Sequence, residues 1–241
     1  MKEMLNGFFC FLWILFKNCQ KKFLKLKFEG DLQYQCFDSQ RLKLIAKMLP
    51  KNPVIFEAGS NDGTDTIKIH KMWPNSKIIA MEADPYNFKR FLKNTQKYPN
   101  IQGYQLAVNT FSGSVKFNIS KFNRNIGSLL KPPSGLGFFL RNQQIDIPCE
   151  NLDQWCKDNQ IDHIDFMWLD LEGIELQILQ SSPSILKTVK VIYTETRLKS
   201  VRSKTSLYVP LRSFLESEGF ELKAHWYTQN FIGDAIFQRL C

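Results

Sequence analysis

Four apolar runs along this chain each end in an acidic residue, and the four acids are Glu57, Glu82, Asp170 and Glu195. In an open parallel sheet the carboxyl ends of the strands meet at one edge, and ligands bind in the crevice there. We therefore expect the four side chains to surround one cleft. Carboxylates that lie close together repel one another unless a cation or hydrogen-bond donors lie between them. One such acid alone is more often a helix cap, but four in equivalent positions favour a ligand site.

The loop after the first run contains two glycines at a spacing that suits a small ligand. It reads Glu57-Ala58-Gly59-Ser60-Asn61-Asp62-Gly63-Thr64. Glycine permits a tight turn and a close approach of a ligand to the backbone, and the following helix offers free N–H groups at its N-terminus. The G-x-x-x-G spacing differs from the G-x-G-x-x-G of dinucleotide-binding loops, which argues against a pyrophosphate cradle. Glu82 ends the second run, where an acid commonly binds ribose hydroxyls.

A ligand that carries both positive charge and hydroxyl groups would satisfy this set of acids. S-adenosylmethionine has a sulfonium, an ammonium and a pair of ribose hydroxyls, so we expect it as the cofactor. The residues that the pattern predicts to bind it are Glu57, Gly59, Gly63 and Glu82.

Alternating strands and helices must position these residues. We expect strands at 54–56, 78–81, around 104–108, at 166–169 and at 189–194, with helices between them. Uniformly apolar strands separated by helices indicate a parallel sheet that is covered on both faces. The last two apolar runs are joined by a short turn and must be antiparallel. The sequence therefore predicts an α/β fold with a mostly parallel, doubly wound sheet and one antiparallel strand from a C-terminal hairpin.

The chain divides into three regions by composition. Residues 1–30 are apolar and basic, residues 31–53 are expected to form a helical arm, and residues 54–241 form the main domain. Within that domain, residues 111–150 fall outside the alternating pattern. We expect them to form an insertion that faces the substrate, because functional loops sit on a rigid scaffold.

The N-terminal region contains an unbroken apolar run at 8–16 that precedes a cluster of lysines. The run is too short to cross a bilayer, which requires about 20 helical residues. One interpretation of residues 8–27 is therefore peripheral contact with an anionic membrane surface. The alternative is a helix that covers an apolar patch of its own domain or of a second subunit, so the oligomeric state stays open.

The net charge does not point to a nucleic-acid partner. The chain carries a formal charge of +9, but its first 28 residues account for +5 and the other 213 for only +4. A nucleic-acid groove needs a basic stripe within the folded part, and none is visible. The six cysteines form no C-x-x-C pair, which favours reduced thiols in a cytoplasmic protein that is membrane-associated at most through its N-terminus.

These motifs resemble those of the FkbM family of methyltransferases over roughly residues 54–237. The family's first motif is similar to Glu57, Gly59, Ser60, Asn61, Gly63 and Thr66. The segment Asp165–Gly173 reads D-F-M-W-L-D-L-E-G and is similar to the family's D-F-I-K-I-D-V-E-G. The resemblance implies a Rossmann-like methyltransferase fold, and it adds Asn61, Thr66 and Ala107 to the expected cofactor-binding residues.

The resemblance also implies O-methylation of a hydroxyl on a sugar, a glycan or a related natural product. Methyl transfer from sulfonium to oxygen depends mainly on positioning the reactants, and a nearby base helps the hydroxyl to react. Asp170 and Glu172 are the candidate catalytic residues. They could instead chelate a divalent cation such as magnesium, and Glu172 could simply cap the next helix. Glu195 and His225 are candidates for substrate contact, although packing is the more ordinary role for His225.

Two other functions are compatible with parts of the sequence. A nicotinamide-dependent oxidoreductase would share the fold, but the glycine spacing opposes it. A non-catalytic, membrane-tethered binding module would explain the N-terminal region, but the retained acids at the strand ends oppose it. The pattern as a whole favours a methyltransferase that acts on a small-molecule or glycan acceptor.

Overall fold

A computed structural model describes residues 27–28, 38–120, 127–130, 142–200, 205–227 and 231–240. Nearly all of the segment for which membrane contact is predicted, and the helical arm before residue 38, lie outside the described residues. In the described ranges no helix has the length and apolar character needed to cross a membrane.

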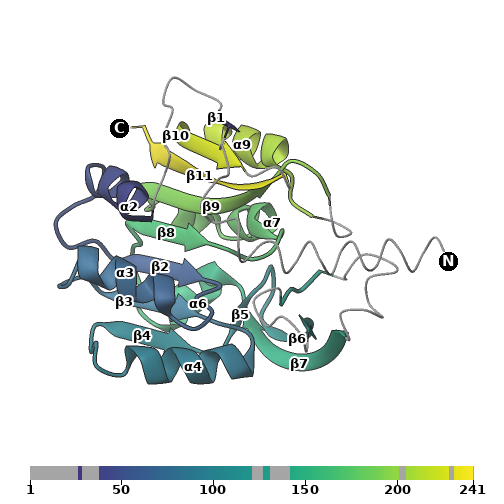
Figure 1. Cartoon of the computed structure of the whole chain (residues 1–241). Helices are drawn as coiled ribbons and strands as arrows, with labels where there is room; N and C mark the ends of the chain where they lie inside the picture. The colour runs from purple at the N-terminus through teal and green to yellow at the C-terminus, as the bar shows by residue number, and fades with distance from the viewer. Residues whose placement is uncertain are drawn as a thin grey trace.

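An eight-stranded sheet forms the centre of the molecule (Figure 1). Its strands, in spatial order, are β1 (Lys27–Phe28), β10 (Phe220–Tyr227), β11 (Ile232–Arg239), β9 (Val191–Arg197), β8 (Phe166–Leu169), β2 (Ile55–Ala58), β3 (Ile78–Met81) and β4 (Ile101–Tyr104). Strands β9, β8, β2, β3 and β4 pair in parallel. Strand β11 is antiparallel to both β9 and β10. The predicted fold, with one reversed strand from the C-terminal hairpin, is confirmed, and the short β1 adds a second antiparallel edge.

The first strand, expected at 54–56, is β2 at Ile55–Ala58 and so includes Glu57 near its end, and two other strands differ more from the sequence prediction. The expected third strand around 104–108 is wrong, because β4 ends at Tyr104 and Ala107 belongs to a separate sheet. The strand expected to end before Glu195 instead continues to Arg197, since β9 keeps pairing with β11 over its whole length. Glu195 therefore lies within a strand and not at its carboxyl end.

Helices cover both faces of the sheet. One face carries α2 (Asp38–Ala46) and α3 (Thr64–Met72), with α4 (Pro85–Thr95) beside α3 (Figure 1). The other face carries α6 (Leu152–Asp158), α7 (Glu175–Gln180), α8 (Pro183–Leu186) and α9 (Tyr208–Ser217). Consecutive strand residues point to opposite faces, so Ile55 packs with the first set of helices and Phe56 with the second. Strands that are buried on both faces explain the uniformly apolar runs.

A second, three-stranded sheet lies beside the edge of the main sheet at which β8 ends (Figure 1). Its strands are β5 (Ala107–Val108), β7 (Asn142–Glu150) and β6 (Gly113–Ser120). Phe117, Ile119 and Ile147 form its small apolar core. The predicted insertion thus contains a β-hairpin, although its residues 121–126 and 131–141 lie outside the described part.

The loop between β2 and α3 is fixed to its two neighbouring strands by backbone hydrogen bonds. The amides of Gly59 and Ser60 donate to the carbonyl of Met81 at 2.9 and 3.1 Å, and the amide of Asp170 donates to the carbonyl of Ala58 at 3.0 Å. Gly59 has a φ of 87°, and a Cβ at this position would lie 2.0 Å from the Asp170 carbonyl oxygen. Only glycine therefore fits at this position.

We predict that Gly59→Ala destabilises the protein by about 3 kcal/mol or more, because backbone strain and a backbone clash act together. Gly113→Ala is the matched control: Gly113 also has a positive φ, 145°, but a Cβ there would meet no atom within 4 Å. The control should lose only about 1 kcal/mol. Urea unfolding of both variants measures the difference, and equal losses would contradict the close packing of this loop on β8.

Candidate active site

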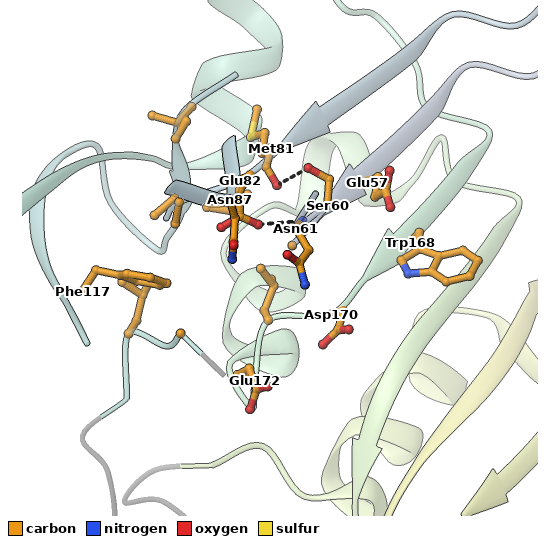
Figure 2. A pocket seen from close by; sticks show the side chains of 18 of the residues that line it. Glu57, Ser60, Asn61, Met81, Glu82, Asn87, Phe117, Trp168, Asp170 and Glu172 are labelled. Carbon is orange, nitrogen blue, oxygen red and sulfur yellow. Dashed lines mark hydrogen bonds between the residues drawn. The ribbon is translucent and has the colours of Figure 1, made fainter. Parts of the chain in front are cut away.

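A cavity opens at the carboxyl edge of the parallel strands, between the main sheet and the small sheet (Figure 2). Its walls come from the segments that follow β2, β3 and β8, together with β5, β6 and residues 127–130. Among the described residues, the carboxylates that line it are Glu57, Asp62, Asp65, Glu82, Asp170 and Glu172. The predicted convergence of the acids at the ends of β2, β3 and β8 is thus what the structure shows.

Glu57 is almost fully buried under α3 and has one strong donor. Its Oε2 accepts a hydrogen bond of 2.5 Å from the Thr66 hydroxyl, and its side chain is 1% exposed. Burial raises the pKa of Glu57 to about 8, against the opposing effect of the Thr66 hydrogen bond. Thr66 is itself buried and does not line the cavity, so the structure places it against Glu57.

Glu82 holds the glycine loop in place from the end of β3. Its Oε2 accepts from the Asn61 amide, as Figure 2 shows, and its Oε1 accepts from the Asp84 amide, each at 2.7 Å. Burial raises the pKa of Glu82 to about 7, although both hydrogen bonds favour the charged form. Each carboxylate oxygen has a second lone pair, so Glu82 can bind loop amides and ligand hydroxyls together.

Asp170 follows β8 and faces the cavity, with Phe117 of the small sheet on the opposite side (Figure 2). Its side chain is accessible through the cavity, and no described residue donates a hydrogen bond to its carboxylate. Burial among the surrounding protein atoms, and then the charge of Glu172, raise the pKa of Asp170 well above its ordinary value, while Arg197 opposes the shift.

Glu172 lines the cavity next to Asp170 but has a fixed cationic partner. Its Oε2 lies 2.7 Å from a terminal nitrogen of Arg197, Nη2. Glu172 has a φ of 59°, in the left-handed region that is uncommon for a residue with a side chain. The helix α7 has Ile174 at its N-cap, so the capping role that the sequence allowed for Glu172 is not what the structure shows. Glu175, in the first turn of α7, accepts from the amides of Leu171 and Gly173 at 3.0 Å.

The described residues contain no group of three or more His, Cys, Asp or Glu side chains placed to hold a metal ion. Asp170 and Glu172, the predicted ligands of a divalent cation, contribute two carboxylates. Because Glu172 is ion-paired with Arg197, a cation at this point would compete with a guanidinium.

Besides Thr66, three predicted site residues do not line the cavity. Gly63 has a φ of 81° and packs against α4. Glu195 accepts a hydrogen bond of 2.7 Å from Nη2 of Arg197. His225 is buried and stacks on Tyr208 at 3.8 Å, and burial lowers its pKa to about 4. The predicted contacts of these residues with cofactor or substrate stay predictions.

Of the remaining predicted residues, Gly59, Asn61 and Ala107 line the cavity. The sequence analysis missed Phe117, which lines the cavity from the insertion, and Arg197. Arg197 had a detectable signal, because it follows Glu195 by two positions and alternate residues of a strand share a face.

Comparison with known sequences places the chain in a family. The family described as methyltransferase FkbM domain matches residues 57–222. The chain is 26% identical over 208 residues to the 2-O-methyltransferase NoeI of Sinorhizobium fredii, an alignment that covers 80% of this chain and 83% of that protein.

Solved methyltransferase structures also align with the chain. Precorrin-6y C5,15-methyltransferase of Geobacter metallireducens aligns with a TM-score of 0.48 and 14% identity, over 88% of this chain and 94% of that one. Fibrillarin of Aeropyrum pernix, solved with S-adenosyl-L-methionine, aligns with a TM-score of 0.47 and 10% identity, over 83% and 74% of the two chains.

The family match extends over more than half of the chain and includes the acids at the ends of β2, β3 and β8. The resemblance that the motifs indicated is thereby confirmed. The chain belongs to the FkbM family of methyltransferases and is an S-adenosylmethionine-dependent methyltransferase.

Proposed function

We propose that this enzyme transfers the methyl group of S-adenosylmethionine to a hydroxyl of a sugar, a glycan or a related natural product, with Asp170 as the general base. The observation that carries the proposal is the accessible carboxylate of Asp170 in the cavity, which receives no hydrogen bond from a described residue. The related protein from Sinorhizobium fredii is a 2-O-methyltransferase, which supports an oxygen acceptor.

The lining of the cavity fits S-adenosylmethionine in charge and in polarity. Glu57, Glu82 and Asp170 supply negative charge around a space that also has an apolar wall of Leu106, Ala107, Val108, Phe117, Leu129 and Ile174. Carboxylates suit an ammonium, a sulfonium and ribose hydroxyls, and apolar side chains suit the adenine ring. When bound, the cofactor supplies an electrophilic methyl group.

Each carboxylate has a separate proposed role in binding. Glu82, fixed by the Asn61 and Asp84 amides, accepts hydrogen bonds from the ribose hydroxyls. Glu57, fixed by Thr66, supplies negative charge beneath the glycine loop. Because both acids are held by protein donors before any ligand arrives, little side-chain entropy is lost on binding.

Asp170 is suited to accept a proton from the acceptor hydroxyl. Burial and the neighbouring Glu172 raise its pKa, which strengthens the carboxylate as a proton acceptor. We assign Asp170 to proton transfer and not to metal binding, because its neighbour Glu172 is already paired with Arg197. Phe117 offers an apolar surface across the cavity from Asp170 (Figure 2).

Asp170→Asn should lower kcat about 10²- to 10⁴-fold, the usual contribution of a general base, and leave binding of S-adenosylhomocysteine within about threefold. Methyl transfer to a panel of hydroxylated acceptors measures the first effect, and calorimetry measures the second. Asp162→Asn is the control, because its side chain is 91% exposed before β8, at the other edge of the sheet. A fully active Asp170→Asn enzyme would exclude this residue as the base.

Glu82→Gln should weaken the binding of S-adenosylhomocysteine by about 1–3 kcal/mol, because the amide NH₂ cannot accept the hydrogen bonds that a carboxylate oxygen accepts. Calorimetry checks this value against Glu221→Gln, an exposed residue at the start of β10 that is paired with Lys223. Equal affinities of the two variants would remove Glu82 from the cofactor site.

The affinity for S-adenosylmethionine should rise with pH. Glu57 has a pKa of about 8 and Glu82 of about 7 in the ligand-free protein, and only their ionised forms attract a cationic ligand. Below the pKa of a required carboxylate, affinity should fall about tenfold per pH unit. Calorimetry from pH 6 to pH 9 measures the profile, and Glu57→Gln should flatten its upper part. An affinity that decreases with pH would contradict these assignments.

A further inference from the structure

Arg197 lies at the end of β9 and is buried between the loop after β8 and the C-terminal hairpin of β10 and β11. It is 4% exposed, and its backbone pairs with Ile232 of β11. A buried guanidinium needs ionised partners, because an unpaired charge in a protein interior is costly. The partners of Arg197 therefore indicate which parts of the site it holds in place.

One atom of Arg197 makes both of the ion pairs that it has with described residues. Nη2 lies 2.7 Å from Oε2 of Glu172 and 2.7 Å from Oε2 of Glu195. The first partner belongs to the cavity wall and the second to β9 itself. The guanidinium thus joins the loop after β8 to the neighbouring strand, directly beside Asp170.

The backbone conformation of Glu172 needs support from its surroundings, and the ion pair with Arg197 provides part of it. Its φ of 59° is a strained conformation, of the kind that persists only where the surroundings enforce it. Glu175 fixes the loop by accepting from the amides of Leu171 and Gly173, and Arg197 fixes the side chain of Glu172. Asp170 lies at the start of the same loop, so its position depends on both contacts.

Arg197 also balances the charge around Asp170. The acidic groups that act on Asp170 come from its own loop, from α7 and from β11, and they are Glu172, Asp234 and Glu175. On β9, Glu195 and Tyr193 also interact with it. Arg197 lowers the pKa of Asp170 against this set, and Arg41 pairs with one of its members, Asp234, at 3.7 Å.

We propose that Arg197 is a positioning residue of the active site, which holds Glu172 in the cavity wall and thereby fixes the loop that carries Asp170. The inference rests on the proposed role of Asp170 as the base. It adds that this role depends on Arg197, which does not itself line the cavity. It predicts that Arg197 acts on turnover and on its pH dependence, and not on cofactor binding.

The test compares pH profiles of kcat for three variants of the full chain. Arg197→Gln removes the positive charge, so Asp170 should protonate more readily and the acid limb of the profile should move up by about one pH unit or more. Glu172→Gln removes a negative neighbour, so the acid limb should move down. Arg197→Lys should retain most of the wild-type profile, because the single nitrogen that makes both ion pairs can be replaced by an ammonium.

Calorimetry with S-adenosylhomocysteine separates this inference from the proposed function. We expect affinities within about threefold of wild type for all three variants, with a loss of kcat of about tenfold or more confined to Arg197→Gln and Glu172→Gln. If Arg197→Gln does not fold, the other two variants still decide: the acid limb should move down in Glu172→Gln and stay in place in Arg197→Lys. Acid limbs that stay in place, or that move in the same direction in Arg197→Gln and Glu172→Gln, would overturn the proposal. An active Asp170→Asn enzyme would instead remove the base assignment itself.

Discussion

The crowding of carboxylates at one edge of a parallel sheet is the constraint on which the rest of this structure depends. Strands β2, β3 and β8 run in the same direction, so the acids that end them converge on one cavity. Each buried carboxylate needs a donor or a cation, because a charge that is left without one is costly. Glu57 uses the Thr66 hydroxyl, Glu82 uses two backbone amides, and Glu172 uses Arg197.

The cost of burying these carboxylates falls on the ligand-free protein at neutral pH. Burial raises the pKa of Glu57 from an ordinary value of 4.5 to about 8. Between these values the folded state binds more protons than the unfolded state, so the stabilising contribution is complete at low pH and is lost as the pH rises through 8. A cationic ligand would pair with the ionised form, so binding of such a ligand would be coupled to the loss of the proton from Glu57.

The site residues that could be predicted from the sequence are those whose positions depend only on the order and direction of the strands. Glu57, Glu82 and Asp170 were found because short apolar runs mark strands, and parallel strands end at one edge. Glu195 was expected at a strand end because nothing local shows that β9 continues to Arg197, where pairing with β11 sustains it. The third strand was placed too late because the sequence does not show that Ala107 pairs with Cys149 of β7. Pairing across distant segments decided both cases.

The contacts of Arg197 and Glu175 also could not be predicted from the sequence, because they join segments that come together only in the fold. Both residues act on the loop after β8, one from β9 and the other from the first turn of α7. Their effect on Asp170 is of opposite sign, since Glu175 raises its pKa and Arg197 lowers it. A base needs a proton affinity that is high enough to accept a proton and low enough to be ionised at the start. Glu175 and Arg197 are both buried, and neither lines the cavity. Together they can set the proton affinity of Asp170 without donating a hydrogen bond to its carboxylate.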